Sequence, residues 1–166
     1  MEIYLDNAAT SWPKPESVYE AVEHFMRHIG TSSGRGGYQR ALKADTIVFE
    51  ARSILAKLFN IADASRVIFT ANATEAINLA VKGIIGERAQ VITTNVEHNA
   101  VWRCLKTLEK SGQIKLDIIP SDAEGNFDLE VLKERISSRT ALVAANHASN
   151  VTGAAAPIEE IGKVTK

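Results

Sequence analysis

The feature that most constrains the fold is an alternation of short β-prone runs with helical segments in the second part of the chain. Four runs are predicted to be strands, at residues 66–70, 89–94, 114–119 and 141–145. Helices are predicted between them at residues 74–84, about 99–110 and 128–136. The strands recur roughly every 23–27 residues, which is the length of a strand, a crossover helix and two loops. The pattern therefore predicts a three-layer α/β/α fold with a mostly parallel sheet.

The first part of the chain has a different, helical pattern. After an extended stretch of twelve residues, apolar residues at helical spacing predict helices over 15–29 and about 40–60, each with one apolar face turned inward. The glycine-rich segment 30–39 (GTSSGRGGYQ) is predicted to be the loop between them. We expect a division into residues 1–40, with the first helix and this loop, and residues 41–166, which begin a larger domain.

Composition and charge limit the possible functions. The 166 residues are 45% hydrophobic and 23% charged, enough to bury a core, and 19 Lys plus Arg against 20 Asp plus Glu give a net charge of -1. This balance provides no field that would steer the chain to nucleic acid or to a membrane surface. The single cysteine excludes an intrachain disulfide and fits the cytoplasm. His24 and His28 lie one helical turn apart, but with no third ligand nearby we expect no metal site.

Small and polar residues follow three of the predicted strands, where parallel sheets bind ligands. Ala73 and Thr74 open the helix after the first strand, with the Thr74 hydroxyl predicted in the cap position, and their amides and this hydroxyl could receive a phosphate. An ordinary helix start explains the same residues. His98 follows the second strand and could act as an acid, a base or a stacking partner. Asn150 lies in the polar loop after the fourth strand.

Taken together, four segments resemble the class V aminotransferase family, in particular its cysteine desulfurase and selenocysteine lyase-like branch. The segments are Tyr4-Leu5-Asp6-Asn7-Ala8-Ala9-Thr10, then Val67–Thr70 with Ala73–Ala80, Glu97-His98-Asn99-Ala100 and His147–Gly153. They occur in the family's order on a matching α/β pattern. The resemblance covers nearly the whole chain but about half of the family's usual length, so we expect an N-terminal part of such an enzyme.

The resemblance implies a homodimeric fold type I enzyme that uses pyridoxal 5'-phosphate. By this resemblance, Ala73 and Thr74 hold the cofactor phosphate, and His98 stacks on the ring and moves protons. Asn150 lies near the cofactor oxygen and the substrate carboxylate. The residues that line the substrate pocket are Asn7, Ala8 and Ala9, with Arg35 and Tyr38 in the glycine-rich loop of the same or a neighbouring subunit. The implied reaction removes sulfur from L-cysteine, giving alanine and an enzyme persulfide that a sulfur-acceptor protein could receive.

Several departures from the family limit this expectation. No lysine in the sequence follows a histidine, so the Schiff-base lysine is missing, and so is the aspartate that pairs with the pyridine nitrogen. We therefore expect the 166-residue chain to be inactive alone. A class V aminotransferase or a selenocysteine lyase is the alternative activity. A non-catalytic chain that acts in binding or assembly, or a general phosphate-binding module, is the alternative of another class.

Overall fold

The computed structural model describes residues 3–34 and 36–166 and divides into two compact units, with the boundary after Phe69. Each unit is described by itself. Among the described residues, no helix combines the length and the apolar character needed to cross a membrane.

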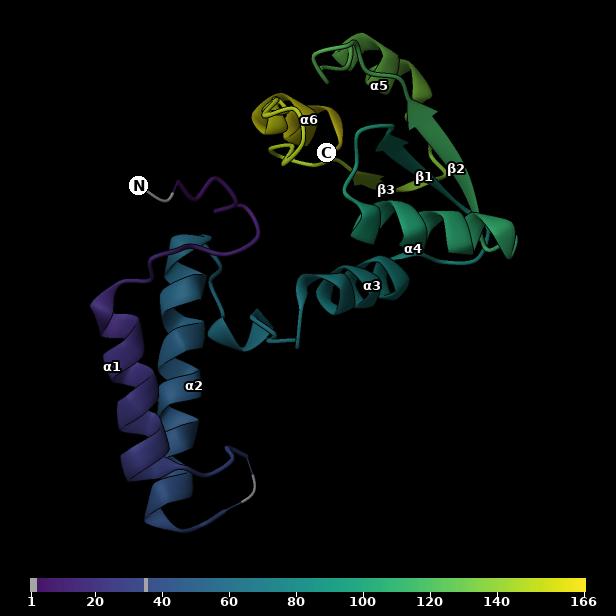
Figure 1. Cartoon of the computed structure of the whole chain (residues 1–166). Coiled ribbons are helices and arrows are strands. Elements are labelled where there is room, and N and C mark those ends of the chain that lie inside the picture. The colour runs from purple at the N-terminus through teal and green to yellow at the C-terminus, as the bar shows by residue number, and fades with distance from the viewer. Residues whose placement is uncertain (1–2, 35) are drawn as a thin grey trace. The chain divides into compact units, whose positions relative to one another are not determined.

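The first unit is built on two helices joined by the glycine-rich loop (Figure 1). Helix α1 spans Glu16–His24 and continues as a π-helical turn, Phe25–Ile29, and helix α2 spans Gln39–Leu58. Gly30 ends the first helix with a positive φ of 51°, a conformation that glycine adopts without strain. Both predicted helices are thus confirmed. The opening stretch is not fully extended, because residues 7–9 form a turn in which the Ala9 amide donates to the Asp6 carbonyl.

The predicted inward faces of these helices are only partly buried. Ile29, Ala44 and Ala56 are buried, but several members of the predicted apolar stripes are exposed, namely Val18, Val22, Met26, Ile47, Ile54 and Leu58. The helical spacing identified the apolar faces correctly. Their burial was wrongly predicted, because a helix pair buries only the residues along its contact, and no further described element of this unit covers the rest.

The strand predicted at 66–70 is not formed. Residues Ala64–Arg66 form a 3-10 turn, and residues 67–70 are unpaired, with Ile68 and Phe69 exposed. A strand exists only through hydrogen bonds to a neighbour. Among the described residues nothing pairs with this segment, so its β-prone composition alone gave a wrong prediction.

The second unit is a three-layer α/β/α arrangement, as the alternating pattern predicted. Its elements follow in the order α3 (Ala73–Ile84), β1 (Ala89–Thr94), α4 (Asn99–Lys110), β2 (Ile114–Ile119), α5 (Leu129–Arg135), β3 (Thr140–Ala144) and α6 (Ile158–Val164). The sheet order is β2-β1-β3, and both pairings are parallel. Figure 1 shows α3 and α4 on one side of the sheet and α5 and α6 on the other.

Alternate residues of the strands build two separate cores on the two faces of the sheet. Val91 packs with Leu105 of α4 and Val81 of α3 on one face. Ile92 packs with Leu132 of α5 and Ile161 of α6 on the other. Successive side chains of a strand point to opposite faces, so β1, which is buried on both, is the centre of the unit.

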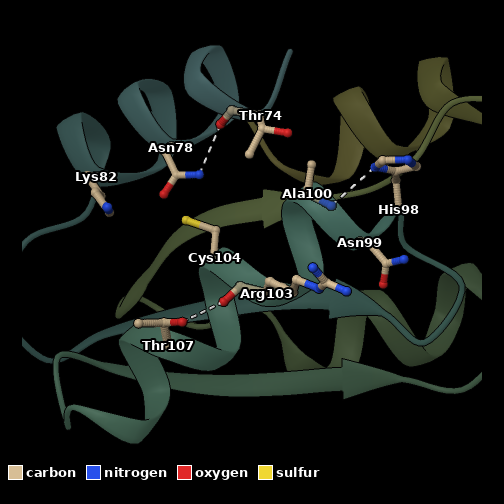
Figure 2. Close-up of a pocket in the computed structure, with 9 residues that line it drawn as sticks. All are labelled: Thr74, Asn78, Lys82, His98, Asn99, Ala100, Arg103, Cys104 and Thr107. Carbon is tan, nitrogen blue, oxygen red and sulfur yellow. Dashed lines mark hydrogen bonds between the residues drawn. The ribbon is translucent and has the colours of Figure 1, made fainter. Parts of the chain in front are cut away.

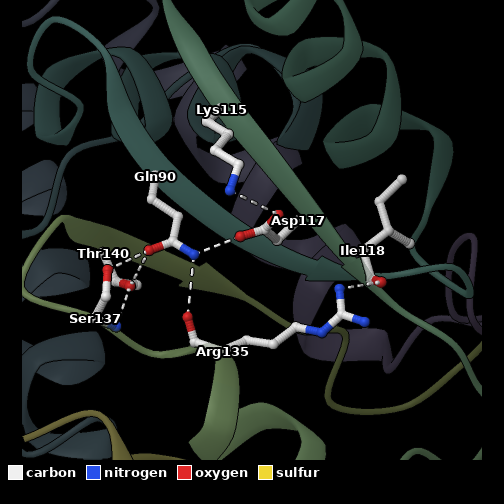
Figure 3. Close-up of polar contacts among 7 residues, drawn as sticks. All are labelled: Gln90, Lys115, Asp117, Ile118, Arg135, Ser137 and Thr140. Carbon is white, nitrogen blue, oxygen red and sulfur yellow. Dashed lines mark hydrogen bonds and ion pairs between the residues drawn. The ribbon is translucent and has the colours of Figure 1, made fainter.

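A buried glutamine near the start of β1 bonds to both neighbouring strands (Figure 3). The Gln90 amide nitrogen donates to Asp117 and, at 3.0 Å, to the Arg135 carbonyl. Its oxygen accepts from Ser137 Oγ at 2.6 Å and Thr140 Oγ1 at 2.8 Å. All four hydrogen-bonding positions of the side-chain amide are therefore used, and together they link β1 to the middle of β2 and to the start of β3.

Candidate functional site

The amino end of α3 is the first part of the candidate site. Asn72 is the N-cap, and its Oδ1 accepts the Glu75 amide at 2.9 Å, while Glu75 Oε2 accepts the Ala71 amide at 2.9 Å. This is a reciprocal arrangement of the capping-box kind. The sequence placed a threonine at the cap. The structure shows that the cap is Asn72, and Thr74 lies within the first turn.

This cap leaves the next donors of the helix available. No intramolecular hydrogen bond of the described residues uses the amides of Ala73 and Thr74 or the Thr74 hydroxyl as a donor. Free amides at the positive end of a helix dipole are the usual receptor for a phosphate group. The residues present therefore fit the phosphate of a cofactor.

His98 is the second part of the site and is the N-cap of α4. Its Nδ1 accepts the Ala100 amide at 3.1 Å. A ring nitrogen that accepts an N–H cannot carry a proton itself, so the neutral ring bears its proton on Nε2. The side chain is exposed, and Nε2 is the atom that it offers for proton transfer.

A cavity of about 310 Å³ lies between α3 and α4 and connects the two parts (Figure 2). Thr74, Asn78 and Lys82 line it from α3, and Figure 2 shows them facing the α4 side. The α4 side is lined by His98, Asn99, Ala100, Arg103, Cys104 and Thr107. Lys82 and Arg103 make the lining positive, and it contains no acidic side chain. The cavity is therefore suited to an anionic group.

A second cavity, of about 550 Å³, lies on the sheet side of α3. His98 and Ala73 line it together with Glu97, Asn146 and His147, and apolar residues of α3 and β3 complete it. His98 thus borders both cavities, with Thr74 in one and Ala73 in the other. These three predicted residues are brought together at the carboxyl edge of the sheet.

Asn150 lies in the loop after β3 and lines neither cavity. It is exposed in a turn that Ser149 holds in shape. Ser149 Oγ accepts the amides of Val151 and Thr152, each at 3.2 Å, and its carbonyl accepts the Gly153 amide at 2.9 Å. The loop therefore has a defined shape, and the role of Asn150 stays a prediction.

The remaining predicted residues belong to the first unit. Asn7, Ala8 and Ala9 form the turn described above, in which Asn7 Oδ1 also accepts the Trp12 amide at 3.2 Å. Tyr38 is the N-cap of α2, and its hydroxyl contacts Thr31 Oγ1. Arg35 lies outside the described residues. Their expected approach to a substrate stays a prediction.

Two hydrogen-bond acceptors in the loop after β1, Glu97 and Asn95, were not identified from the sequence. Glu97 Oε1 accepts Thr94 Oγ1 and the Asn146 amide, both at 2.8 Å. Burial raises the pKa of the Glu97 carboxyl above its ordinary value, and the bonds from Asn146 and Thr94 act in the opposite direction. Asn95 Oδ1 accepts the Ser121 amide at 2.9 Å. The only feature of the sequence that could have identified these two residues is their position within three residues of His98.

The raised pKa of Glu97 predicts a pH-dependent stability. The folded carboxyl holds its proton to a higher pH than the unfolded one, so folding is favoured at low pH and loses stability as the pH rises through the raised pKa. Glu97→Gln keeps an acceptor oxygen but cannot ionise. We expect the unfolding free energy of the variant, relative to that of the wild type, to increase as the pH rises. Urea denaturation at a series of pH values measures this difference. Glu159→Gln is the control on an exposed residue, and a difference for Glu97→Gln that stays flat or falls would contradict the assignment.

Comparison with known proteins identifies relatives over the whole chain. The family model Aminotransferase class-V matches residues 3–166. Cysteine desulfurase IscS of Rickettsia massiliae is 35% identical over 170 residues, covering 100% of this chain and 41% of the relative. Cysteine desulfurase IscS of Dictyoglomus turgidum is 36% identical, with 99% and 42% covered. The chain thus spans about two fifths of the length of the curated relatives that it matches.

Solved structures agree with this result. The apo cysteine desulfurase of Thermococcus onnurineus NA1 is 32% identical, with a TM-score of 0.87 over 98% of this chain and 40% of that one. A structure titled NifS-like protein is 29% identical, with a TM-score of 0.90 over 100% of this chain and 46% of that one. The resemblance drawn from the four sequence segments is confirmed.

Proposed function

The chain belongs to the class V aminotransferase family, and from this premise we propose that it forms part of a pyridoxal 5'-phosphate enzyme that removes sulfur from L-cysteine. The observation that carries the proposal is the pair of unused amides and the hydroxyl at the start of α3, next to His98 at the start of α4. The names of the relatives support the choice of reaction. Homodimer formation, a sulfur-acceptor protein and a cytoplasmic location belong to the same proposal.

Each proposed role follows from the chemistry of the residue. The Ala73 and Thr74 amides and the Thr74 hydroxyl would hold the cofactor phosphate. His98 would lie on the ring of the cofactor and exchange a proton through Nε2. Asn150 would bind near the cofactor oxygen and the substrate carboxylate. When bound, the cofactor supplies the electron sink for bond cleavage at the substrate.

Residues of the first unit would complete the substrate pocket. Asn7, Ala8 and Ala9 would line it, and Arg35 and Tyr38 would reach it from the glycine-rich loop. The lysine and the aspartate that the family uses on the cofactor are absent from this sequence. The 166-residue chain is therefore proposed to be inactive alone, and the reaction belongs to the polypeptide that contributes those residues.

The reaction is tested with the natural polypeptide that carries this sequence. With pyridoxal 5'-phosphate, L-cysteine and a thiol reductant, we expect alanine and sulfide in equal amounts, and His98→Ala should lower turnover at least about a hundredfold. Lys57→Ala, on an exposed residue at the end of α2, is the control. A 2-oxo acid in place of sulfide would indicate an aminotransferase. Faster turnover of L-selenocysteine would indicate a selenocysteine lyase, and no product from any of these substrates would favour a non-catalytic role.

A further inference from the structure

Glu97 holds together two loops that are far apart in the sequence. Its Oε1 accepts the backbone N–H of Asn146 at 2.8 Å, across 49 residues of chain, and the Thr94 hydroxyl at 2.8 Å. The first bond joins the loop after β1 to the loop after β3. The second is local and fixes the carboxyl group against the buried end of β1. One carboxyl oxygen thus links the segment that carries His98 to the segment that leads to Asn150.

The choice of a carboxyl group at this place has a cost. Glu97 is partly buried, and among the ion pairs of the described residues none includes it. A partly buried carboxylate without a cation is unfavourable unless its hydrogen bonds compensate. The two donors offset part of this penalty, and charged acceptors bind amides more strongly than neutral ones. These two directional bonds fix the positions of the loops more precisely than an apolar side chain in the place of Glu97 would.

The opposite side of the same loop is held by Asn95. Its side-chain Oδ1 accepts the backbone N–H of Ser121 at 2.9 Å. Its backbone N–H donates to the Ile119 carbonyl at 3.2 Å. The four residues 95–98 are therefore tied to the β2 side by Asn95 and to the β3 side by Glu97. His98 is the last of them, and its Nδ1 is fixed by the Ala100 amide.

We propose that Glu97 is a positioning residue that holds His98 and the 146–153 loop in fixed register through its bond to the Asn146 amide. The inference rests on the proposed function, because His98 and Asn150 are the residues proposed to act on the cofactor and the substrate. Glu97 itself contacts neither. It acts by keeping the ring of His98 and the loop with Asn150 at one separation, so that both engage the same bound molecule.

Three variants of the natural polypeptide separate this role from simple stabilisation. Glu97→Gln keeps an oxygen that can accept both bonds. Glu97→Ala removes both bonds. Glu97→Asp keeps the charge but shortens the reach to Asn146, and it replaces Glu97→Ala in every comparison if that variant does not fold. Thr94→Val is the control, because it removes only the local bond.

The first readout is hydrogen exchange at the backbone N–H of Asn146, which does not depend on turnover. We expect exchange to be at least about tenfold faster in Glu97→Ala than in the wild type, and within about threefold of the wild type in Glu97→Gln and in Thr94→Val. Unchanged exchange in Glu97→Ala would overturn the inference. So would equal acceleration in Glu97→Gln.

The second readout is catalysis and the absorption spectrum with pyridoxal 5'-phosphate bound. We expect Glu97→Ala to lower kcat by at least about tenfold with little change in KM and to shift the cofactor absorption, and Glu97→Gln to restore both. A variant that loses only thermal stability, with kcat and spectrum unchanged, would overturn the positioning role. If the wild type binds no pyridoxal 5'-phosphate, the proposed function fails, and the exchange readout still decides whether Glu97 links the two loops.

Discussion

Replacing Ala73 by proline is expected to weaken binding of pyridoxal 5'-phosphate to the natural polypeptide by about tenfold to a hundredfold. Ala73 is the first residue of α3, and Asn72 before it is extended, with φ -163° and ψ 166°. Proline is tolerated at this position and after an extended residue, so the helix should persist. The variant removes one amide donor, and a hydrogen bond to a charged group accounts for a loss of this size. Equilibrium dialysis measures the affinity.

The matched control for this variant is Glu16→Pro. Glu16 is the exposed first residue of α1, and Pro15 before it has polyproline-like angles, with φ -55° and ψ 143°. The control removes an amide from a helix start that has no proposed ligand, and it should leave the affinity unchanged. Equal losses in the two variants, or none in Ala73→Pro, would contradict a phosphate site at α3.

Truncating Leu105 to alanine is expected to destabilise the 166-residue chain by about 2–5 kcal/mol, the usual range for a fully buried leucine. Leu105 is 0% exposed and packs from α4 against Val91 of β1 and Val81 of α3. The cavity left behind would lie where α3 and α4 pack on the sheet, so the helices that carry Thr74 and His98 would loosen together. Urea denaturation measures the change.

Leu79→Ala serves as the control for the core variant. Leu79 lies on α3 and is 55% exposed, so its truncation should change the unfolding free energy by about 0.5 kcal/mol or less. Similar losses in the two variants would contradict the assignment of Leu105 to the central core.

The second unit could be predicted from the sequence because its signals are local. The ranges 89–94, 99–110 and 114–119 match β1, α4 and β2 at both ends. Each is bounded by turn residues, α4 buries one periodic apolar face, and β1 is a short run that is buried on both faces. The segment 66–70 has an equally clear β-prone composition but remains unpaired. Composition reports the tendency of a segment, and pairing depends on a partner that the segment does not encode.

Part of the candidate site could likewise be predicted from the sequence, and part of it could not. The placement of His98 follows from the topology, because parallel strands bring their following loops to one edge of a sheet. Thr74 follows a segment that forms no strand, so its place beside His98 comes from the packing of α3 against α4 and the sheet. The bond between Glu97 and Asn146 could not be predicted, because it depends on which strand lies beside β1. The identity of the helix cap, Asn72 rather than a threonine, likewise depends on the backbone conformation at the start of α3.

The start of α3 is proposed to bind the phosphate of the cofactor. This proposal is tested most directly by measuring the dissociation constants of pyridoxal 5'-phosphate and of pyridoxal, which lacks the phosphate, with the natural polypeptide under identical conditions. We expect pyridoxal to bind at least about a hundredfold more weakly, because it leaves the Ala73 and Thr74 donors unused. Equal dissociation constants for the two compounds would contradict it.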